Sequence, residues 1–233
     1  MADVPVLKVM TSNALRTVFV TLLPAFERAH GVKVAATYDP AKRVQKRIAA
    51  GGTADVAVSN VPAIERMIGE GILDAATRRD FARYGIGVAV KAGAPKPDLS
   101  TVEAFTRALL GARRIARTVE GASGIYFSDL IVRLGIAEAV NAKSSPQPGG
   151  LCAEQLLDDR ADLAIQQVPE LLAAGPGIEL AGVFPPPLQV ESVLGAGVFK
   201  SSAQAAAGRA FIDFLAQAEA APVFRAAGFE PLA

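Results

Sequence analysis

Short apolar segments alternate along the chain with longer segments in which apolar residues recur every three or four positions. From Leu15 to Phe26 this recurrence places the apolar side chains on one face of a helix, which Gly31 ends. The short apolar segments between such helices are typical of buried strands. Strands and helices in alternation predict an α/β protein whose sheets are mostly parallel. The predicted strands are residues 7–10, 32–37, 55–59, 86–91, 115–118, 163–165 and 193–199.

Two segments rich in proline and glycine divide the chain. Residues 92–97 and 185–187 interrupt the regular pattern, because proline and glycine break helices and strands. The segment between these breaks is long enough to form a lobe of its own, with the C-terminal helices returning to the first lobe. We therefore predict lobe 1 from residues 1–84 and 193–233 and lobe 2 from residues 85–192, joined by a two-segment hinge.

Charge and composition exclude several classes of function. The chain has 24 Lys and Arg against 23 Asp and Glu, so no strong positive field would attract nucleic acid. Its one cysteine, Cys152, has no partner for an internal disulfide, and its one histidine, His30, directly precedes Gly31. We therefore expect His30 to lie in the last turn of a helix rather than in a catalytic triad or a metal site. The chain is predicted to have no metal, no cofactor and no nucleic-acid partner.

Common cofactor and hydrolase motifs are absent from the sequence. Gly85 and Gly87 begin like a dinucleotide fingerprint, but Val90 occupies the third glycine position inside a predicted strand. The phosphate-binding motif GxxxxGK[ST], the zinc motif HExxH and the nucleophile motif GxSxG do not occur. There is also no run of 18 apolar residues, so no membrane-spanning helix is predicted.

Small polar residues gather where predicted strands give way to helices. In an open α/β sheet, ligands bind beyond the carboxyl ends of the strands, where helix N-termini offer unpaired N–H groups. Several such ends together predict a site for a small anion. The alternative is that Ser12, Asp39 and Ser123 are only N-caps of the following helices. The candidate ligand-binding residues are Thr11, Ser12, Asn13, Tyr38, Asp39, Ser59, Asn60, Ser123, Gly124, Gln166 and Gln167.

Three basic residues are candidate partners for the charge of such an anion, namely Lys42, Arg43 and Arg117. Arginine suits a carboxylate because it donates two parallel hydrogen bonds, whereas uncharged donors alone suit a tetrahedral oxyanion. Lys42 and Arg43 lie on an otherwise polar helix, so a solvated basic face is the alternative for them. These residues therefore leave the class of anion open.

Several longer segments carry a family resemblance. They include FERAHGVKV at residues 26–34, ADVAVS at 54–59, FIDFL at 211–215 and GFEP at 228–231. With them the chain resembles, over nearly its whole length, the periplasmic solute-binding proteins of ABC importers, specifically the molybdate-binding-protein-like group. Other segments are VKAGAPKPD at 90–98, GASGIY at 121–126, LGIA at 134–137 and QQVPELL at 166–172. These are similar to a branch of the group that includes the bacterial aconitate isomerases.

The resemblance implies the type II periplasmic-binding-protein fold, in which two α/β lobes joined by a two-segment hinge hold the ligand in the cleft between them. Ser12 matches a serine that molybdate binders carry in their first loop. However, residues 37–42 do not form a serine-rich second loop, and Gln166-Gln167 stands where a tyrosine is expected. Asp39 would also repel molybdate unless it faces its own helix. A carboxylate is therefore the expected ligand, and a molybdate or tungstate oxyanion is an alternative.

The resemblance leaves a receptor and an enzyme as competing functions. As a receptor, the chain would be a monomeric solute-binding protein whose partners are a small anion and the membrane subunits of an ABC transporter. As an isomerase of the aconitate isomerase type, it would shift an allylic proton on a tricarboxylate, which requires an acid and a base near the substrate carbon. The candidates for those two roles are Asp39, Glu120, Tyr126 and Lys42. A diverged scaffold without a small ligand is a third alternative.

The cellular location depends on which function holds. Residues 1–5 have neither the basic region nor the apolar region of a signal peptide. A receptor is expected in the periplasm after removal of a signal peptide, whereas a native start at Met1 predicts a cytoplasmic protein.

Overall fold

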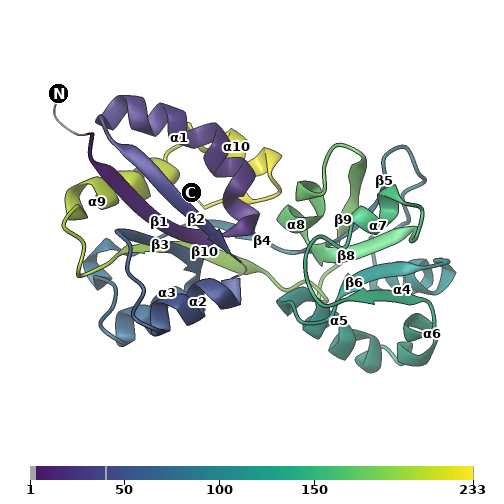
Figure 1. Ribbon diagram of the computed structural model, residues 1–233. Coiled ribbons are helices and arrows are strands. Elements are labelled where there is room, and N and C mark those ends of the chain that lie inside the picture. The colour runs from purple at the N-terminus through teal and green to yellow at the C-terminus, as the bar shows by residue number, and fades with distance from the viewer. Residues whose placement is uncertain (1–3, 40, 233) are drawn as a thin grey trace. The chain divides into compact units, whose positions relative to one another are not determined.

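The chain folds into two α/β units (Figure 1). Unit 1 consists of Met1–Arg83 with Ser192–Ala233, and unit 2 consists of Tyr84–Glu191. The computed structural model describes residues 4–39 and 41–232, without the side chains of Asn13, Ala41, Lys42 and Gln45. The chain passes from one unit to the other twice, at residues 83–84 and 191–192. The α/β class predicted from the sequence is confirmed in both units.

Unit 1 is built on a six-stranded sheet with the strand order β11-β4-β10-β3-β1-β2. Its elements are β1 (Val6–Ser12), η1 (Asn13–Leu15), α1 (Arg16–His30), β2 (Lys33–Asp39), α2 (Ala41–Ala49), β3 (Val56–Asn60), α3 (Val61–Gly69), η2 (Ala75–Thr77), β4 (Arg79–Tyr84), β10 (Ser192–Val198), α9 (Ala205–Leu215), α10 (Ala221–Ala226) and β11 (Glu230–Pro231). Strand β1 pairs in parallel with β2 and β3, whereas β10 is antiparallel to β3. The expectation of mostly parallel sheets is wrong here, because β10 enters at the carboxyl end of β3 when the chain returns from unit 2.

Helices cover both faces of the unit 1 sheet (Figure 1). On one face, α1 and α9 meet through aromatic rings, with Phe211 5.6 Å from Phe19 and 5.1 Å from Phe26 between ring centroids. On the other face, α2 and α3 contribute Ile48 and Ile64 to a separate buried cluster. The sheet is therefore buried on both sides, and its strand ends are where polar groups can reach a ligand.

The end of α1 follows from its sequence. Gly31 caps the helix with a φ of 63°, a left-handed conformation that glycine adopts without a steric penalty. His30 lies in the last turn and stacks on Phe26, with ring centroids 4.4 Å apart. The prediction that His30 ends a helix is confirmed.

Unit 2 contains a five-stranded sheet with the strand order β7-β6-β8-β5-β9. Its elements are β5 (Ile86–Lys91), α4 (Val102–Gly111), β6 (Ile115–Thr118), α5 (Ala122–Arg133), α6 (Ala137–Asn141), β7 (Ser144–Gln147), α7 (Glu154–Leu157), β8 (Leu163–Gln167), α8 (Val168–Ala173) and β9 (Ile178–Val183). Strand β6 is parallel to β7 and β8, whereas β5 is antiparallel to both β8 and β9. This sheet is also mixed rather than mostly parallel.

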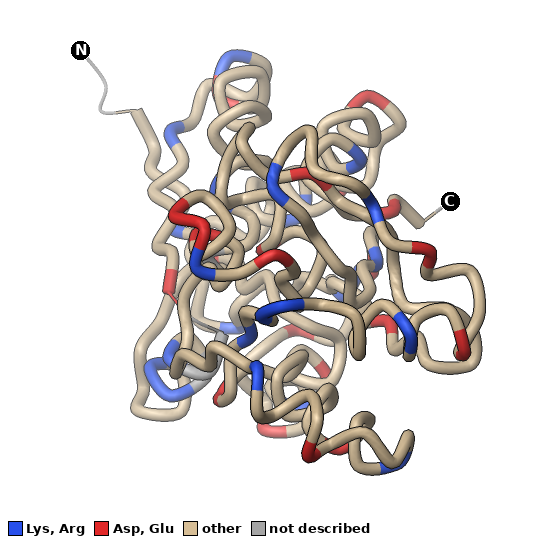
Figure 2. Tube along the Cα trace, turned by 90° about the vertical axis from the view of Figure 1, so that its right-hand side faces the viewer, with Lys and Arg blue, Asp and Glu red and all other residues tan. Residues whose placement is uncertain are grey.

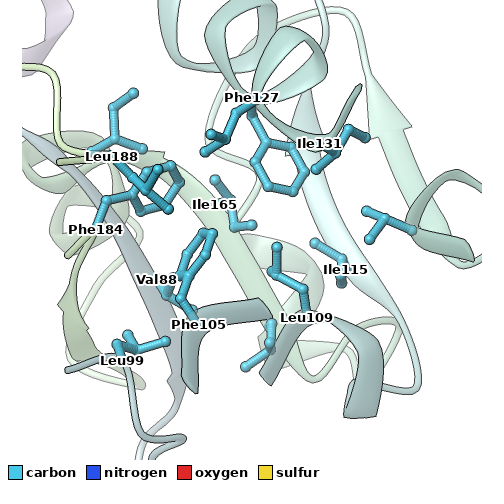
Figure 3. Packing of buried hydrophobic residues seen from close by; sticks show 14 of the residues in the cluster. Val88, Leu99, Phe105, Leu109, Ile115, Phe127, Ile131, Ile165, Phe184 and Leu188 are labelled. Atoms are coloured by element: carbon cyan, nitrogen blue, oxygen red, sulfur yellow. The ribbon is translucent and has the colours of Figure 1, made fainter. Parts of the chain in front are cut away.

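The larger core of unit 2 is centred on three phenylalanines (Figure 3). The ring of Phe184 lies 4.7 Å from that of Phe105 on α4 and 6.4 Å from that of Phe127 on α5, between centroids. On the opposite face of the sheet, Cys152 and Leu171 belong to a second buried cluster with small residues of β5, β6 and β8. Because successive side chains of a strand point to opposite faces of the sheet, Arg117 and Thr118 of β6 point to opposite faces.

The sequence pattern missed the strands β4, β7, β9 and β11 and the short helices α6, α7 and α8. Strand β4 lacks an apolar pattern because its charged side chains form ion pairs. Arg83 bonds to Glu230 at 2.8 Å, and Arg79 bonds to Asp213 at 2.7 Å. Strand β7 contains Pro146 and pairs only with β6, as expected for an edge strand.

Charged residues of both signs are interspersed along the trace (Figure 2). This distribution agrees with the net charge of +1. Within residues 4–39 and 41–232, none of the helices combines the length and the apolar character needed to cross a bilayer.

Candidate functional site

The turn from β6 to α5 leaves hydrogen-bonding groups unused at the end of a strand. Thr118 is the last residue of β6 and is 2% exposed, yet within residues 4–39 and 41–232 its Oγ1 has no hydrogen-bond partner. Gly121 occupies the N-cap position of α5, and no side chain caps this helix. The N-terminus of α5 therefore offers unpaired N–H groups and a partial positive charge beside a buried hydroxyl.

Glycines allow the first turn of α5 to lie this close to β6. A Cβ atom on Gly124 would lie 1.9 Å from the carbonyl oxygen of Thr118, which no side chain could tolerate. The same hypothetical atom would lie 3.2 Å from Thr118 Oγ1, and one on Gly121 would lie 3.1 Å from it. The hydroxyl thus sits directly against the first turn. Ser123 is buried in that turn, and the alternative that it is the N-cap is wrong because Gly121 holds that position.

Unit 1 has a similar feature at the end of β1. Thr11 is fully buried and its Oγ1 also has no partner among the described side chains, while Ser12 ends the strand half-buried. The register pairs Thr11 with Tyr38 and Ser12 with Asp39 on β2. Helix α1, which follows after η1, has Leu15 at its N-cap and no side-chain capping bond. Ser12 is therefore not the N-cap of α1.

Buried polar atoms without a partner are concentrated at these two strand ends. Among the described side chains there are four, namely Thr11 Oγ1, Thr118 Oγ1, Arg117 Nε and Gln155 Oε1. An unsatisfied buried donor or acceptor costs about 1–3 kcal/mol, so each requires an explanation. Three of the four belong to β1 or β6, and hydrogen bonds with a ligand would supply the missing partners of the two threonine hydroxyls.

Arg16 is a charged group at this edge of unit 1 that the sequence analysis missed. Its guanidinium carbon lies 4.3 Å from the ring centroid of Tyr38, and no carboxylate pairs with it in the described part of the chain. Burial raises the pKa of the Tyr38 hydroxyl, and the Arg16 charge lowers it in part. The aromatic face holds the guanidinium in place while leaving its donors available. Its position just after Thr11–Asn13 was the signal that could have identified it.

Several of the predicted ligand-binding residues instead bond to other groups of the protein. Asp39 forms ion pairs with Arg47 at 2.8 Å and with Arg43 at 3.8 Å. The side chain of Asn60 caps α3 by accepting a hydrogen bond from the Ala63 N–H. Their polar groups therefore stabilise the local structure of unit 1.

Gln166 and Tyr126 are occupied in the same way in unit 2. The carboxamide of Gln166 accepts a hydrogen bond from the Cys152 N–H and donates one to the Gly150 carbonyl. The Tyr126 hydroxyl donates to the Leu188 carbonyl at 2.7 Å. Gln167 stands at the N-cap of α8 without a side-chain capping bond.

The remaining predicted residues divide between the units. Ser59 is buried in β3 opposite Gly195 of β10. Glu120 is exposed in the turn before α5. The side chains of Asn13 and Lys42 lie outside the described structure. The proposed catalytic set of Asp39, Lys42, Glu120 and Tyr126 is not brought together within one unit, because the first two belong to unit 1 and the last two to unit 2.

A second residue that the sequence analysis missed is Glu170, in the first turn of α8. Burial raises the pKa of its carboxyl group to about 7, although a hydrogen bond with Gln166 opposes this shift. Burial also raises the pKa of the nearby Cys152 thiol to about 12, so this cysteine is a neutral core residue. Within the described part of the chain, no group of three His, Cys, Asp or Glu side chains is arranged to hold a metal ion.

The sequence matches a known protein family over almost all of its length. The profile of the family described as "Bacterial extracellular solute-binding protein" matches residues 7–230. An aconitate isomerase from a Pseudomonas species is 29% identical over 235 aligned positions, which cover 98% of this chain and 89% of that protein.

Solved structures of binding proteins have the same fold. A substrate-binding domain assigned to a molybdenum ABC transporter of Clostridium difficile aligns with a TM-score of 0.77 and 16% identity, covering 98% of this chain and 99% of that one. The periplasmic molybdate-binding protein of Azotobacter vinelandii aligns with a TM-score of 0.73 and 23% identity, covering 96% and 98% of the two chains. These likenesses confirm the predicted type II periplasmic-binding-protein fold.

The raised pKa of Glu170 predicts a pH-dependent loss of stability. The folded state holds the proton up to about pH 7, whereas the ordinary carboxyl releases it near 4.5. The stabilising contribution is therefore fully present below pH 4.5 and is lost as the pH rises through 7. Because Glu170→Gln stays neutral, we expect its free energy of unfolding to match the wild type at pH 4 and to exceed it by up to about 3 kcal/mol at pH 8.

Urea unfolding of both proteins at pH 4, 6 and 8 measures this difference. Glu154→Gln is the control, because Glu154 is an exposed glutamate in the first turn of the neighbouring helix α7. Its difference from the wild type should stay constant with pH. A difference between Glu170→Gln and the wild type that does not grow with pH would contradict the assignment of a neutral carboxyl.

Proposed function

We propose that this chain, which belongs to the bacterial extracellular solute-binding protein family, binds a small carboxylate anion. The unpartnered groups at the end of β1 in unit 1 and at the end of β6 in unit 2 are each candidate donors for it. The observation that carries the proposal is that the buried hydroxyls of Thr11 and Thr118 have no partner in the described part of the chain. Thr118 ends β6, which leads into α5, and Thr11 is the next-to-last residue of β1, which leads through η1 into α1. No described side chain caps α1 or α5. Hydroxyls and helix N-termini are donors suited to an anion.

A carboxylate is favoured over a tetrahedral oxyanion by Arg16. Its planar guanidinium can donate two parallel hydrogen bonds to a carboxylate, and the Tyr38 ring restrains its orientation. The negative charge of Asp39, which would repel an anion, is balanced by Arg47 and Arg43. The molybdate-binding structures share less than 25% identity with this chain, so their ligand does not decide between the two classes.

The family also supports an extracytoplasmic receptor role. A solute-binding protein of an importer presents its ligand-bound form to the membrane subunits of an ABC transporter, which would then be the macromolecular partner of this chain. We infer a periplasmic location for the same reason.

An isomerase is the second candidate function, supported by the 29% identity with an aconitate isomerase across 98% of this chain. Moving the double bond of an unsaturated tricarboxylate requires a base that removes an allylic proton and an acid that returns one at the other end of the allylic system. Glu170 is a candidate for the base, because a carboxyl with a pKa of about 7 is suited to proton transfer near neutral pH. Glu170 takes the place of Asp39 and Tyr126 as the candidate base, because Asp39 is paired with an arginine and the Tyr126 hydroxyl bonds to a backbone carbonyl.

Replacing either threonine by valine should weaken binding without destabilising the free protein. Valine has nearly the same shape and removes a hydroxyl that has no partner, so the free proteins should be as stable as the wild type or more so. The loss of a hydrogen bond to a charged ligand should raise the Kd of trans-aconitate about tenfold or more for Thr11→Val and for Thr118→Val. Titration calorimetry measures the Kd, and thermal unfolding measures the stability.

Thr77→Val is the matched control for this experiment. Thr77 is also buried, but its hydroxyl donates to the Asp74 carbonyl at 2.6 Å and accepts from the Val198 N–H at 2.9 Å. This variant should lose stability and keep its affinity. The proposal is wrong if Thr11→Val and Thr118→Val behave like Thr77→Val.

The Arg16 side chain should set the preference for carboxylates. We expect Arg16→Gln to raise the Kd of trans-aconitate about tenfold or more, since a charge-assisted bidentate pair is lost, and to change the Kd of sulfate much less. Arg28→Gln, an exposed change in the last turn of the same helix, should leave both values unchanged. An equal loss of affinity for sulfate and trans-aconitate in Arg16→Gln would show a general charge effect instead of carboxylate recognition.

Turnover separates the enzyme from the receptor. If the chain is an isomerase, wild-type protein should convert trans-aconitate to the cis isomer in an absorbance assay, and Glu170→Gln should bind the same ligand while losing most of the activity. Binding without turnover in the wild type would eliminate the isomerase and leave the receptor. Full activity in Glu170→Gln would eliminate Glu170 as the base.

A further inference from the structure

Arg117 is a buried cation without a counterion in the described part of the chain. It lies in β6 and is 9% exposed. Its guanidinium donates to Ser128 Oγ at 2.8 Å and to Asn141 Oδ1 at 3.2 Å, and its Nε has no partner. The ring of Phe127 lies 5.9 Å from its central carbon. All these contacts are with neutral groups, so the charge is not compensated.

A purely structural role does not account for this arrangement. Arginine stays protonated inside proteins, and a buried charge that lacks a partner destabilises the folded state. Burial lowers the pKa of Arg117, as expected for a cation in an apolar environment. An uncharged side chain of similar volume would fill the same space at lower cost. The free-energy cost of burying the Arg117 charge is explained if this charge acts on a group that comes from outside the protein.

The position of Arg117 indicates where such a group from outside the protein would bind. It directly precedes Thr118, whose unpartnered hydroxyl lies against the first turn of α5. Ser128, which accepts a hydrogen bond from Arg117, donates in turn to the Gly124 carbonyl within that turn. The buried charge therefore lies beneath the uncapped N-terminus of α5, where the low dielectric of the core screens it weakly.

We infer that Arg117, without touching the ligand, supplies the positive charge that makes the N-terminal end of α5 favour multiply charged anions. This inference rests on the proposed anion-binding function and assigns its selectivity for charge to one residue. Arg16 recognises the shape of a carboxylate, whereas Arg117 acts on the total charge of the ligand. It is thus a specificity-determining residue and not a ligand contact.

Three probes of the same unsaturated type but different charge test the inference. They are trans-aconitate, fumarate and crotonate, which carry three, two and one carboxylates. For Arg117→Met we expect the Kd to rise about threefold per ligand charge, which corresponds to roughly 30-fold, 10-fold and 3-fold, because a buried charge acts on each ligand charge through a weakly screened field. Arg117→Lys should restore most of the trans-aconitate affinity. The free Arg117→Met protein should melt at the same temperature as the wild type or higher.

Arg114→Met is the matched control, since Arg114 is an exposed arginine just before the same strand. It should change none of the three Kd values more than about twofold, because solvent screens an exposed charge. The inference is overturned if Arg117→Met weakens all probes equally or lowers the melting temperature of the free protein. If fumarate and crotonate bind too weakly to measure, trans-aconitate decides, and a change below threefold overturns the inference. A wild-type protein that binds none of the probes contradicts the proposed function itself.

Discussion

A buried polar atom must form a hydrogen bond or destabilise the folded state. Most buried polar groups in the described part of the chain form hydrogen bonds within the protein. Among the described residues, the exceptions are concentrated at the ends of β1 and β6, where two threonine hydroxyls and one guanidinium nitrogen have no partner. Both strands lead into helices without side-chain caps. Each unit thus carries a buried threonine hydroxyl that has no partner among the described residues.

The packing around β6 is arranged to keep these donors in place. Gly124 lets α5 approach the strand more closely than any residue with a side chain would allow. The cores on the two faces of the unit 2 sheet fix the strand between α5 and the segment that carries Cys152. In unit 1, the stacking of Arg16 on Tyr38 restrains a charged group beside the end of β1. The stability of each unit and the position of its donors therefore depend on the same local contacts.

The sequence predicted the α/β class and the location of polar groups at strand ends, because both follow from local patterns. It could not predict which of these groups would be occupied. Asp39 is neutralised by Arg47, and Gln166 bonds to the backbone of Cys152, and neither contact has a local signature. Arg117 was predicted as a charged partner of the anion, but only the fold shows that it is buried and that no carboxylate among the described residues pairs with it. Strand β4 was missed because ion pairs, rather than apolar alternation, support its charged residues.

The unpartnered hydroxyls at the ends of β1 and β6 are proposed to bind a carboxylate. The most direct test is a thermal-shift measurement of the wild-type protein with trans-aconitate, citrate, sulfate and molybdate, because a ligand that binds only the folded state raises the melting temperature. We expect at least one of the two carboxylates to raise the melting temperature in a concentration-dependent way, and we expect sulfate and molybdate to have little effect. A shift with molybdate or sulfate alone would rule out a carboxylate ligand and would identify the chain as an oxyanion-binding protein.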